Sequence, residues 1–254
     1  MSPRRRILFA VVAVLLVAAG GLAGVRLLGG GDDGPRPDQA TPGTVLLVPG
    51  YGGNTTALAR LRDQLRAEGR TAKIVALPDG GTGDFEAQAA TLDAAVRGET
   101  GSSPSVDIVG YSAGGVVARL WVDRYRGAEV ARRIVTLGSP LHGTRLAAAG
   151  AALAPDACPP ACRQLAPGSA LLDRLAGEDL PEGLPWLSIW TENDETVQPP
   201  DSARLAGAVN VPLQGVCPQR QVSHSQLPTD QAVSAIVTST LAAPALAQPK
   251  ACPV

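Results

Sequence analysis

Residues 106–118 read Val-Asp-Ile-Val-Gly-Tyr-Ser-Ala-Gly-Gly-Val-Val-Ala and contain the most informative motif of the chain. The short apolar run Val106–Val109 predicts a buried strand, and residues 113–125 predict a helix after it. Between them lies a Gly-x-Ser-x-Gly motif centred on Ser112. A serine on a tight strand-to-helix turn needs small neighbours, because its own backbone is strained. A glycine-rich connection with an exposed serine is the alternative, but the flanking strand and helix favour Ser112 as a nucleophile.

The rest of the chain alternates predicted strands with predicted helices. Strands are expected at residues 44–48, 73–77, 106–109, 133–137, 184–190 and 208–212, and helices at residues 55–68, 85–97, 113–125 and 230–241. Asn54 is a suitable N-cap for the first of these helices. This alternation predicts an α/β fold in which about six mostly parallel strands are flanked by helices on both faces.

The folded domain is expected to cover residues 44–254, with an insertion at residues 141–185. That stretch is too long for an ordinary connection between two elements of such a fold. Its apolar side chains would suit acyl chains and would equally suit ordinary packing; they are Leu146, Ala148, Leu153, Leu165, Leu171 and Leu172. Ser169 is a plausible cap for a short helix inside the insertion.

The first 28 residues predict a membrane-targeting segment rather than part of the fold. Three arginines, residues 4–6, precede an uncharged run from Ile7 to Val25. As a helix this run would span roughly 28 Å, close to the hydrocarbon thickness of a bilayer. A cleaved signal peptide and an uncleaved anchor both agree with the pattern, and both place the remainder outside the cytoplasm. Residues 29–43 are rich in Gly, Pro and Asp and predict a flexible linker.

Composition excludes several classes of protein. The chain has 45% hydrophobic and 18% charged residues, a balance that permits a core and excludes disorder throughout. Its formal net charge of -1 argues against a broad basic surface for nucleic acid. The four cysteines have no zinc-finger spacing, and no motif implies a cofactor. We therefore expect neither a metal nor a cofactor.

A serine nucleophile needs a base, and the chain has only two histidines, His142 and His224. His142 follows the fourth predicted strand in a run of small residues, which suits a role in bracing a loop. His224 follows the last predicted strand, and Asp194 follows the fifth. Ser112, Asp194 and His224 thus all lie past carboxyl ends of strands, where open parallel sheets bind ligands. Alternatively, Asp194 is a turn residue and His224 an ordinary loop histidine.

Several stretches of the chain together match the pattern of one enzyme family. They are residues 48–53, residues 109–119, residues 138–144, Asp194 with Val197 and Pro199, and His224. In this order they resemble the oxyanion loop, nucleophile elbow, following loop, acid loop and histidine of α/β-hydrolases, in particular the small bacterial lipases and esterases. The resemblance covers roughly residues 44–241. It implies a minimal α/β-hydrolase fold and a triad of Ser112, Asp194 and His224.

The same resemblance implies where an oxyanion would bind. In that family, one donor is the backbone N–H of the residue after the nucleophile, which is Ala113 here, and the other lies in the first loop, at Tyr51. This chain departs from many relatives, which have His-Gly where it has Pro49-Gly50. The resemblance also implies that the insertion covers the active site.

The cysteines are expected to form disulfides, since an exported chain folds in an oxidising compartment. Four cysteines allow three pairings. We favour Cys158 with Cys162, inside the insertion, and Cys217 with Cys252, which would tie the C-terminal tail to the body.

We therefore expect an exported serine hydrolase that cleaves carboxylic esters through an acyl-enzyme. Its partner would be a small-molecule or lipid ester, it would be a monomer without nucleic acid, and it would contact a membrane only through an uncleaved N-terminal segment. Two alternatives remain: a thioesterase, amidase or acyltransferase of the cell envelope, and a non-catalytic envelope module that retains the fold.

Overall fold

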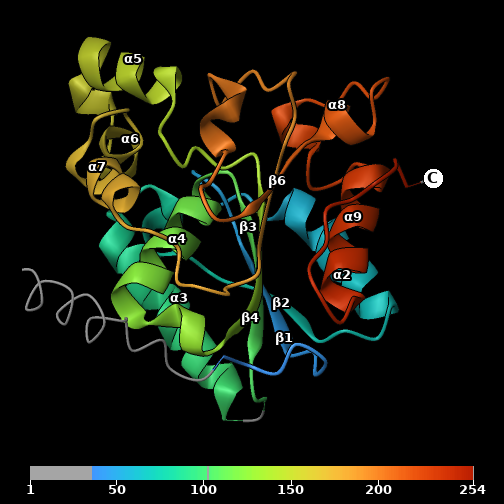
Figure 1. Ribbon diagram of the computed structural model, residues 1–254. Helices are drawn as coiled ribbons and strands as arrows, with labels where there is room; N and C mark the ends of the chain where they lie inside the picture. Colours follow the sequence, from blue (N-terminus) through green and yellow to red (C-terminus); the bar gives the residue numbers. More distant parts are fainter. Residues whose placement is uncertain (1–35, 102, 254) are drawn as a thin grey trace, which may run out of the picture. The chain divides into compact units, whose positions relative to one another are not determined.

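Six parallel strands form one sheet in the order β2-β1-β3-β4-β5-β6 (Figure 1). This computed structural model describes residues 36–101 and 103–253. The strands are β1 Thr44–Val48, β2 Ala72–Ile74, β3 Val106–Tyr111, β4 Ala131–Leu137, β5 Trp186–Trp190 and β6 Val209–Pro212. All five pairings between neighbouring strands are parallel. The expected fold class is thus confirmed.

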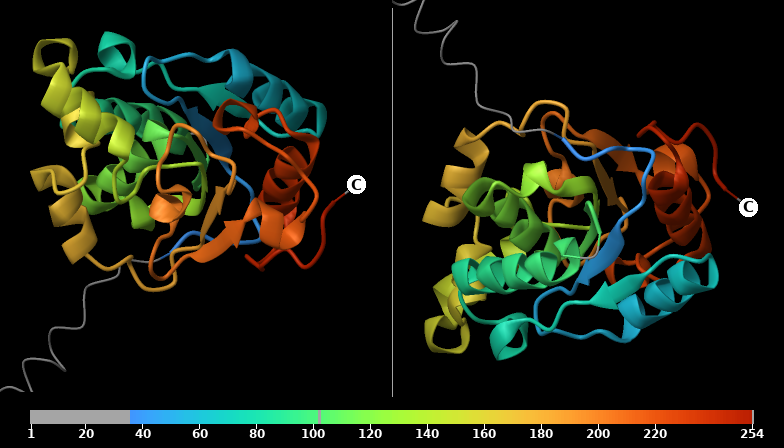
Figure 2. Two further views of the ribbon diagram at one scale, coloured as in Figure 1. Left: turned by 90° about the horizontal axis from the view of Figure 1, so that it is seen from above. Right: turned by 90° about the horizontal axis from the view of Figure 1, so that it is seen from below.

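Helices cover both faces of this sheet. The α-helices are α2 Thr56–Ala67, α3 Phe85–Thr100, α4 Ala113–Tyr125, α5 Arg145–Leu153, α6 Pro160–Gln164, α7 Ala170–Gly177, α8 Leu213–Val216 and α9 Gln231–Ala242. Short 3-10 turns occur at η1 Pro78–Gly81, η2 Gly127–Glu129, η3 Pro155–Ala157, η4 Pro200–Ala203 and η5 His224–Gln226. Helices α3 and α4 pack on one face, and α2 and α9 pack on the other (Figures 1 and 2).

The continuous apolar runs of the strands follow from burial on both sides. Along β1, Leu46 and Val48 face the cluster that contains α3 and α4, whereas Val45 and Leu47 face the cluster that contains α2 and α9. Successive side chains of a strand point to opposite faces, so a sheet covered twice needs an apolar residue at every position. Because all strand pairings are parallel, the carboxyl ends of all six strands lie at one edge of the sheet.

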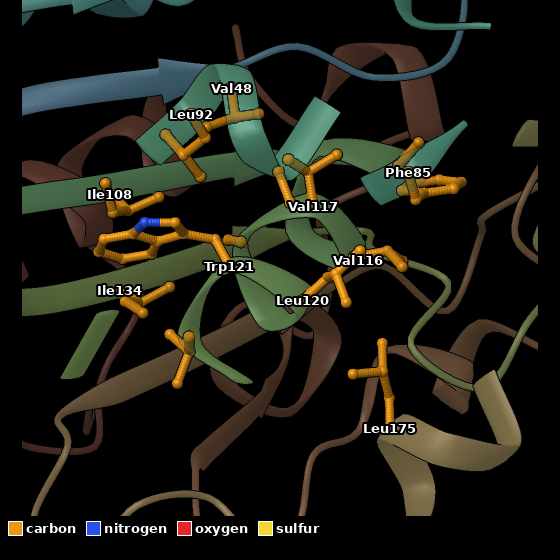
Figure 3. Packing of buried hydrophobic residues seen from close by; sticks show 14 of the residues in the cluster. Val48, Phe85, Leu92, Ile108, Val116, Val117, Leu120, Trp121, Ile134 and Leu175 are labelled. Atoms are coloured by element: carbon orange, nitrogen blue, oxygen red, sulfur yellow. The ribbon is translucent and has the colours of Figure 1, made fainter. Parts of the chain in front are cut away.

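Helix α4 crosses the middle of the first apolar cluster. Trp121 lies between Ile108 of β3 and Ile134 of β4 (Figure 3). Its indole N–H donates to a carboxylate oxygen of Asp93 on α3, at 3.2 Å. Burial of a tryptophan is stabilising when its one polar atom has a partner. The helix that begins immediately after Ser112 is therefore held firmly against the sheet.

The ends of some elements differ from the sequence-based predictions. The second strand ends at Ile74 rather than Leu77, because the chain turns into η1 at Pro78. The fifth strand begins at Trp186 rather than Leu184, since Pro185 has no N–H to give to the sheet. The fourth begins two residues early, at Ala131. Asn54 does bond the first turn of α2, through the N–H of Thr56, but it lies one residue before the N-cap.

The N-terminal targeting segment predicted at residues 1–28 lies outside the described residues, as do residues 29–35 of the predicted linker. The described part of that linker contacts the folded body: the guanidinium of Arg36 donates to the Glu182 carbonyl at 2.8 Å, and that of Arg132 donates to the Gln39 carbonyl at 3.1 Å. In residues 36–101 and 103–253, no helix combines the length and apolar character needed to cross a membrane.

Candidate active site

Ser112 occupies the single residue between β3 and α4, in a conformation that L-amino acids rarely adopt. Its backbone angles are φ 51° and ψ -125°. A non-glycine residue with positive φ is strained, and such strain concentrates at functional sites. The Ser112 N–H donates to the carbonyl of Leu137 at 2.8 Å, which ties the turn to the end of β4. The sharp turn directs the hydroxyl away from the sheet.

Glycines make this turn sterically possible. A Cβ atom on Gly110 would lie 2.7 Å from the Cα of Gly115, and one on Gly114 would lie 2.2 Å from the carbonyl oxygen of Val48. Real Cβ atoms do not approach other atoms so closely, so neither position can carry a side chain without moving the backbone. The Gly-x-Ser-x-Gly spacing is thus explained by contacts of the turn with its own helix and with β1.

Ser112, His224 and Asp194 form a continuous chain of hydrogen bonds. The Nε2 atom of His224 lies 3.0 Å from the Ser112 Oγ, and its Nδ1 lies 2.6 Å from an oxygen of Asp194. The other oxygen of Asp194 accepts N–H bonds from Thr196 at 2.9 Å and Val197 at 2.7 Å. All three residues are buried, with 9%, 5% and 2% of Ser112, His224 and Asp194 exposed.

The topology explains why these three residues meet. Asp194 lies in the loop after β5, and His224 begins η5, after β6 and before α9. Strands β5 and β6 are neighbours, so their loops leave the sheet side by side. The backbone N–H of His224 also donates to a carboxylate oxygen of Glu195 at 3.0 Å, which joins the two loops directly.

Tyr111, the residue before the serine, contacts His224 through both its ring and its hydroxyl. Its ring lies 5.3 Å from the imidazole of His224, and its hydroxyl donates to the His224 carbonyl at 3.3 Å. Burial, followed by the nearby charges of Asp194 and Glu195, raises the pKa of Tyr111 to about 12. The phenol therefore stays protonated and remains a hydrogen-bond donor at neutral pH.

Gly138, just after β4, is a contributor to the site that the sequence did not single out. It has φ +56°, and a Cβ atom there would lie 3.1 Å from the His224 Nδ1 and 3.2 Å from an Asp194 oxygen. Its lack of a side chain leaves room for the histidine and the carboxylate to meet. The only signal was its place at the end of a strand, in the Gly-Ser-Pro run. Glu195 and Tyr111 were also missed.

Of the two residues expected to hold an oxyanion, Ala113 directly follows Ser112 in the chain, and Tyr51 lines the same cavity as Ser112. Ala113 is the first residue of α4, where backbone N–H groups have no partner within the helix. Tyr51 follows Gly50, and a Cβ on Gly50 would lie 2.9 Å from the Ser112 Cβ, so this loop touches the nucleophile. Within the described chain, the N–H groups of Tyr51 and Ala113 donate to no backbone carbonyl.

A cavity of about 270 Å³ opens at Ser112 and is lined mainly by apolar side chains. Helix α5 forms one wall with Leu146, Ala147 and Gly150. Leu165, at the C-terminal end of α6, contributes a further apolar side chain. Leu171 and Leu172 pack in the same core cluster as Leu165 but do not line the cavity, and 85% of Leu153 is exposed. The apolar residues of the insertion thus divide between lining this cavity and ordinary packing.

Both disulfides join the cysteines in the favoured pairing. Cys158 bonds Cys162 inside the insertion, and Cys217, after α8, bonds Cys252 in the tail. Cys162 also lines the cavity at Ser112. A Cβ on Gly150 would lie 3.2 Å from the Cys162 sulfur, so α5 rests directly on the first disulfide.

His142, the other histidine, is placed differently. It is exposed, and its Nε2 donates to the carbonyl of Arg204 at 3.0 Å. Its backbone N–H donates to the Ser202 carbonyl at 3.2 Å. These bonds tie the loop after β4 to η4 and leave His142 outside the hydrogen-bonded chain of Ser112.

Comparison with known proteins gives a likeness of structure. No family model matches the sequence, and no curated protein matches it. The mature lipase BlEst2 of Bacillus licheniformis superposes with a TM-score of 0.65 at 19% identity, over 82% of this chain and 96% of that one. The propeptide form of BlEst2 gives 0.68 at 20% identity, over 85% of this chain and 54% of that one.

A lipase-esterase related protein of Clostridium acetobutylicum ATCC 824 gives a TM-score of 0.57 at 13% identity, over 80% of this chain and 95% of that one. This chain therefore spans nearly all of the mature lipase and about half of its propeptide form. At such low identities the likeness establishes the architecture alone. The chain has the α/β-hydrolase fold.

Proposed function

We propose that this α/β-hydrolase-fold chain is a serine hydrolase that cleaves carboxylic esters through an acyl-enzyme. The observation that carries the proposal is the hydrogen-bonded chain Ser112–His224–Asp194, with distances of 3.0 Å and 2.6 Å. A serine hydroxyl is a weak nucleophile unless a neighbouring base can take its proton. The ester class is supported by the apolar cavity at Ser112 and by the lipases and esterases among the structural neighbours.

In the first half of the proposed reaction, the Ser112 Oγ attacks the ester carbonyl carbon while His224 Nε2 accepts the hydroxyl proton. The carbonyl oxygen becomes an oxyanion, which the N–H groups of Tyr51 and Ala113 stabilise by hydrogen bonds. When this intermediate collapses, the bond to the alcohol oxygen breaks and His224 returns its proton to that oxygen. The alcohol leaves, and the acyl group stays on Ser112.

In the second half, water replaces the alcohol and the steps run in reverse. His224 takes a proton from the water as its oxygen attacks the acyl carbon, and the same N–H groups stabilise the second oxyanion. Collapse breaks the bond to the Ser112 Oγ, which recovers its proton from His224. The net reaction is ester plus water giving carboxylic acid plus alcohol.

Asp194 would act on the histidine. Its carboxylate accepts a hydrogen bond from the Nδ1–H of His224, so that Nε2 faces Ser112 without a proton and can accept the one from the serine hydroxyl. The negative charge also stabilises the imidazolium that forms during attack. Two backbone N–H bonds hold the carboxylate in place, and a fixed charge costs no reorganisation when the reaction occurs.

We also propose that the enzyme works outside the cytoplasm. All four cysteines of the sequence are paired in disulfides, and disulfides persist mainly in oxidising compartments. The basic and apolar N-terminal segment of the sequence agrees with export, either as a cleaved signal or as an anchor.

Labelling with a fluorophosphonate probe tests the nucleophile, and a panel of p-nitrophenyl esters from acetate to palmitate tests the bond. We expect the probe to label Ser112 and esters to turn over faster than matched amides and thioesters. Absence of labelling would favour a non-catalytic module. Faster cleavage of an amide or thioester would keep the triad and replace the substrate class.

A further inference from the structure

A second cavity, of about 360 Å³, lies beside the first and is chemically different from it. Most of the residues that line it have a polar group in the side chain, among them Asn54, Thr56, Ser225 and Thr229. One cation, Arg60, joins them. None of the described residues that line this cavity is an aspartate or a glutamate. Its walls thus combine hydroxyl groups with an excess of positive charge.

This polar cavity adjoins the reacting atoms. Tyr51, from the oxyanion loop, lines both cavities. Ser225 follows His224 in the chain, and Gly50, another lining residue, touches Ser112. The apolar cavity is bounded by α5 and α6, whereas the polar one is bounded by α2, which packs on the opposite face of the sheet. An ester held at Ser112 can therefore extend its acyl half to one side and its alcohol half to the other.

Arg60 differs from its neighbours on α2. The guanidinium of Arg62 pairs with Asp63 at 2.8 Å, and that of Arg66 donates to the Ala72 carbonyl at 2.9 Å. Within the described chain Arg60 has no ion pair or hydrogen bond of its side chain. It lies one helical turn after Thr56 on the same face of α2, so the two side chains line the cavity together. A guanidinium can bind a carboxylate or a phosphate through two parallel N–H bonds.

We propose that the polar cavity receives the alcohol half of the substrate and that this half carries an anionic group, a phosphate or a carboxylate, bound by Arg60. The inference rests on the proposed ester hydrolysis, because it assigns the leaving alcohol to this side of Ser112. The hydroxyl-bearing residues would bind the remaining polar atoms of the alcohol.

Three esters with the same butanoyl group test this assignment: those of glycerol, glycerol 3-phosphate and glycerate. We expect wild-type kcat/KM to be higher for the anionic esters than for the glycerol ester. In Arg60→Gln the ratio of anionic to neutral kcat/KM should fall about tenfold or more, as for loss of a hydrogen bond to a charged group. Arg60→Lys should retain part of the ratio, because it keeps the charge without the planar fork.

Arg62→Gln is the matched control, because it removes the same charge from the same helix outside the cavity. Its ratio should stay at the wild-type value. An Arg60 effect on only one of the two anionic esters would identify the anion as that group. Equal kcat/KM for the three wild-type esters, or an unchanged ratio in Arg60→Gln, would overturn the proposal.

A binding measurement keeps this test independent of turnover. Glycerol 3-phosphate is titrated into the full chain and into its Arg60→Gln variant, and binding is followed by NMR. We expect the variant to bind glycerol 3-phosphate more weakly than the wild type. Equal binding to the two proteins, or no binding to either, would overturn the anion site. If no ester is hydrolysed while binding still depends on Arg60, the esterase proposal fails and the anion site stands.

Discussion

The ring of Tyr111 packs against the imidazole of His224, with the centroids 5.3 Å apart and the planes inclined by 32°. Tyr111 precedes Ser112 in the chain, so the strand that supplies the serine also supports the histidine. The tyrosine hydroxyl reinforces this arrangement by donating to the His224 carbonyl. The two parts of the proposed site, from β3 and from the loop after β6, are thus coupled by packing as well as by the triad itself.

The raised pKa of Tyr111 predicts how stability responds to high pH. The unfolded chain loses this proton near pH 10, but the folded chain keeps it until about pH 12 because of burial and the neighbouring carboxylates. Between these values the folded state binds more protons, so its stability falls as pH rises. Urea unfolding from pH 9 to pH 11.5 should show a steeper loss in wild type than in Tyr111→Phe. Parallel curves would contradict the assignment of this proton.

Ser112→Ala should reduce ester hydrolysis by at least about a thousandfold, as loss of a nucleophile usually does. Ser112→Gly should do the same to activity and should also raise the melting temperature above that of Ser112→Ala. Glycine tolerates φ 51°, which costs other residues on the order of 1 kcal/mol. Calorimetry of the two inactive variants measures this difference. Equal melting temperatures would show that the backbone of the turn is unstrained.

His224→Ala should abolish both ester hydrolysis and labelling by the fluorophosphonate, because Ser112 would lose the base 3.0 Å away. His142→Ala should keep a measurable fraction of activity, since its ring bonds the Arg204 carbonyl instead. The comparison uses the same substitution at the only two histidines of the chain. Loss of labelling in His142→Ala alone would require a different triad.

Gly138→Ala should lower activity more than its effect on stability explains. The added Cβ would lie 2.6 Å from the Leu227 Cδ1, 3.1 Å from the His224 Nδ1 and 3.2 Å from an Asp194 oxygen. Leu227 and the hydrogen-bonded pair would therefore all have to shift. A fall in kcat of about tenfold to a hundredfold is expected for a small displacement of catalytic groups. Gly69→Ala is the control, because it has positive φ (+83°) with nothing near its Cβ. It should lose stability and retain kcat.

The two disulfides should have different functions. Replacing Cys217 and Cys252 by serine opens a loop with a sequence separation of 35 and should cost roughly 3–4 kcal/mol of stability in chain-entropy terms. Replacing Cys158 and Cys162 opens a separation of only 4 and should cost less. Because Cys162 lines the apolar cavity, this second variant should instead change the preference among p-nitrophenyl esters of different chain length. An unchanged preference would contradict that role.

Elements with a strong local signal could be predicted from the sequence. Helix α4 and strand β1 have the bounds that were expected. A glycine-rich turn defines the start of α4, and a continuous apolar run defines β1. The ends of β2 and β5 could not be placed as well, because they depend on where a neighbouring strand stops pairing. Local periodicity contains no information about that neighbour.

The candidate site shows the same division. Ser112 stands out because its motif contains the glycines that the sharp turn requires. The small number of histidines narrowed the search for a base. Gly138 and Glu195 could not be found in this way. The roles of these two residues depend on their contacts with His224 and Asp194. Those contacts form only after β4, β5 and β6 are paired. The apolar residues of α5 were equally ambiguous, since a helix rich in alanine has no polar face to orient it.

The distance along the chain between Ser112 and His224 also affects when activity can arise. The two residues are 112 positions apart, and β4, β5 and β6 must all join the sheet before they meet. A ribosome delivers the serine long before the histidine, so the nascent chain would pass through a period in which its nucleophile has no base. We therefore expect the proposed ester hydrolysis to begin only when β6 and the loop that contains His224 have joined the folded sheet.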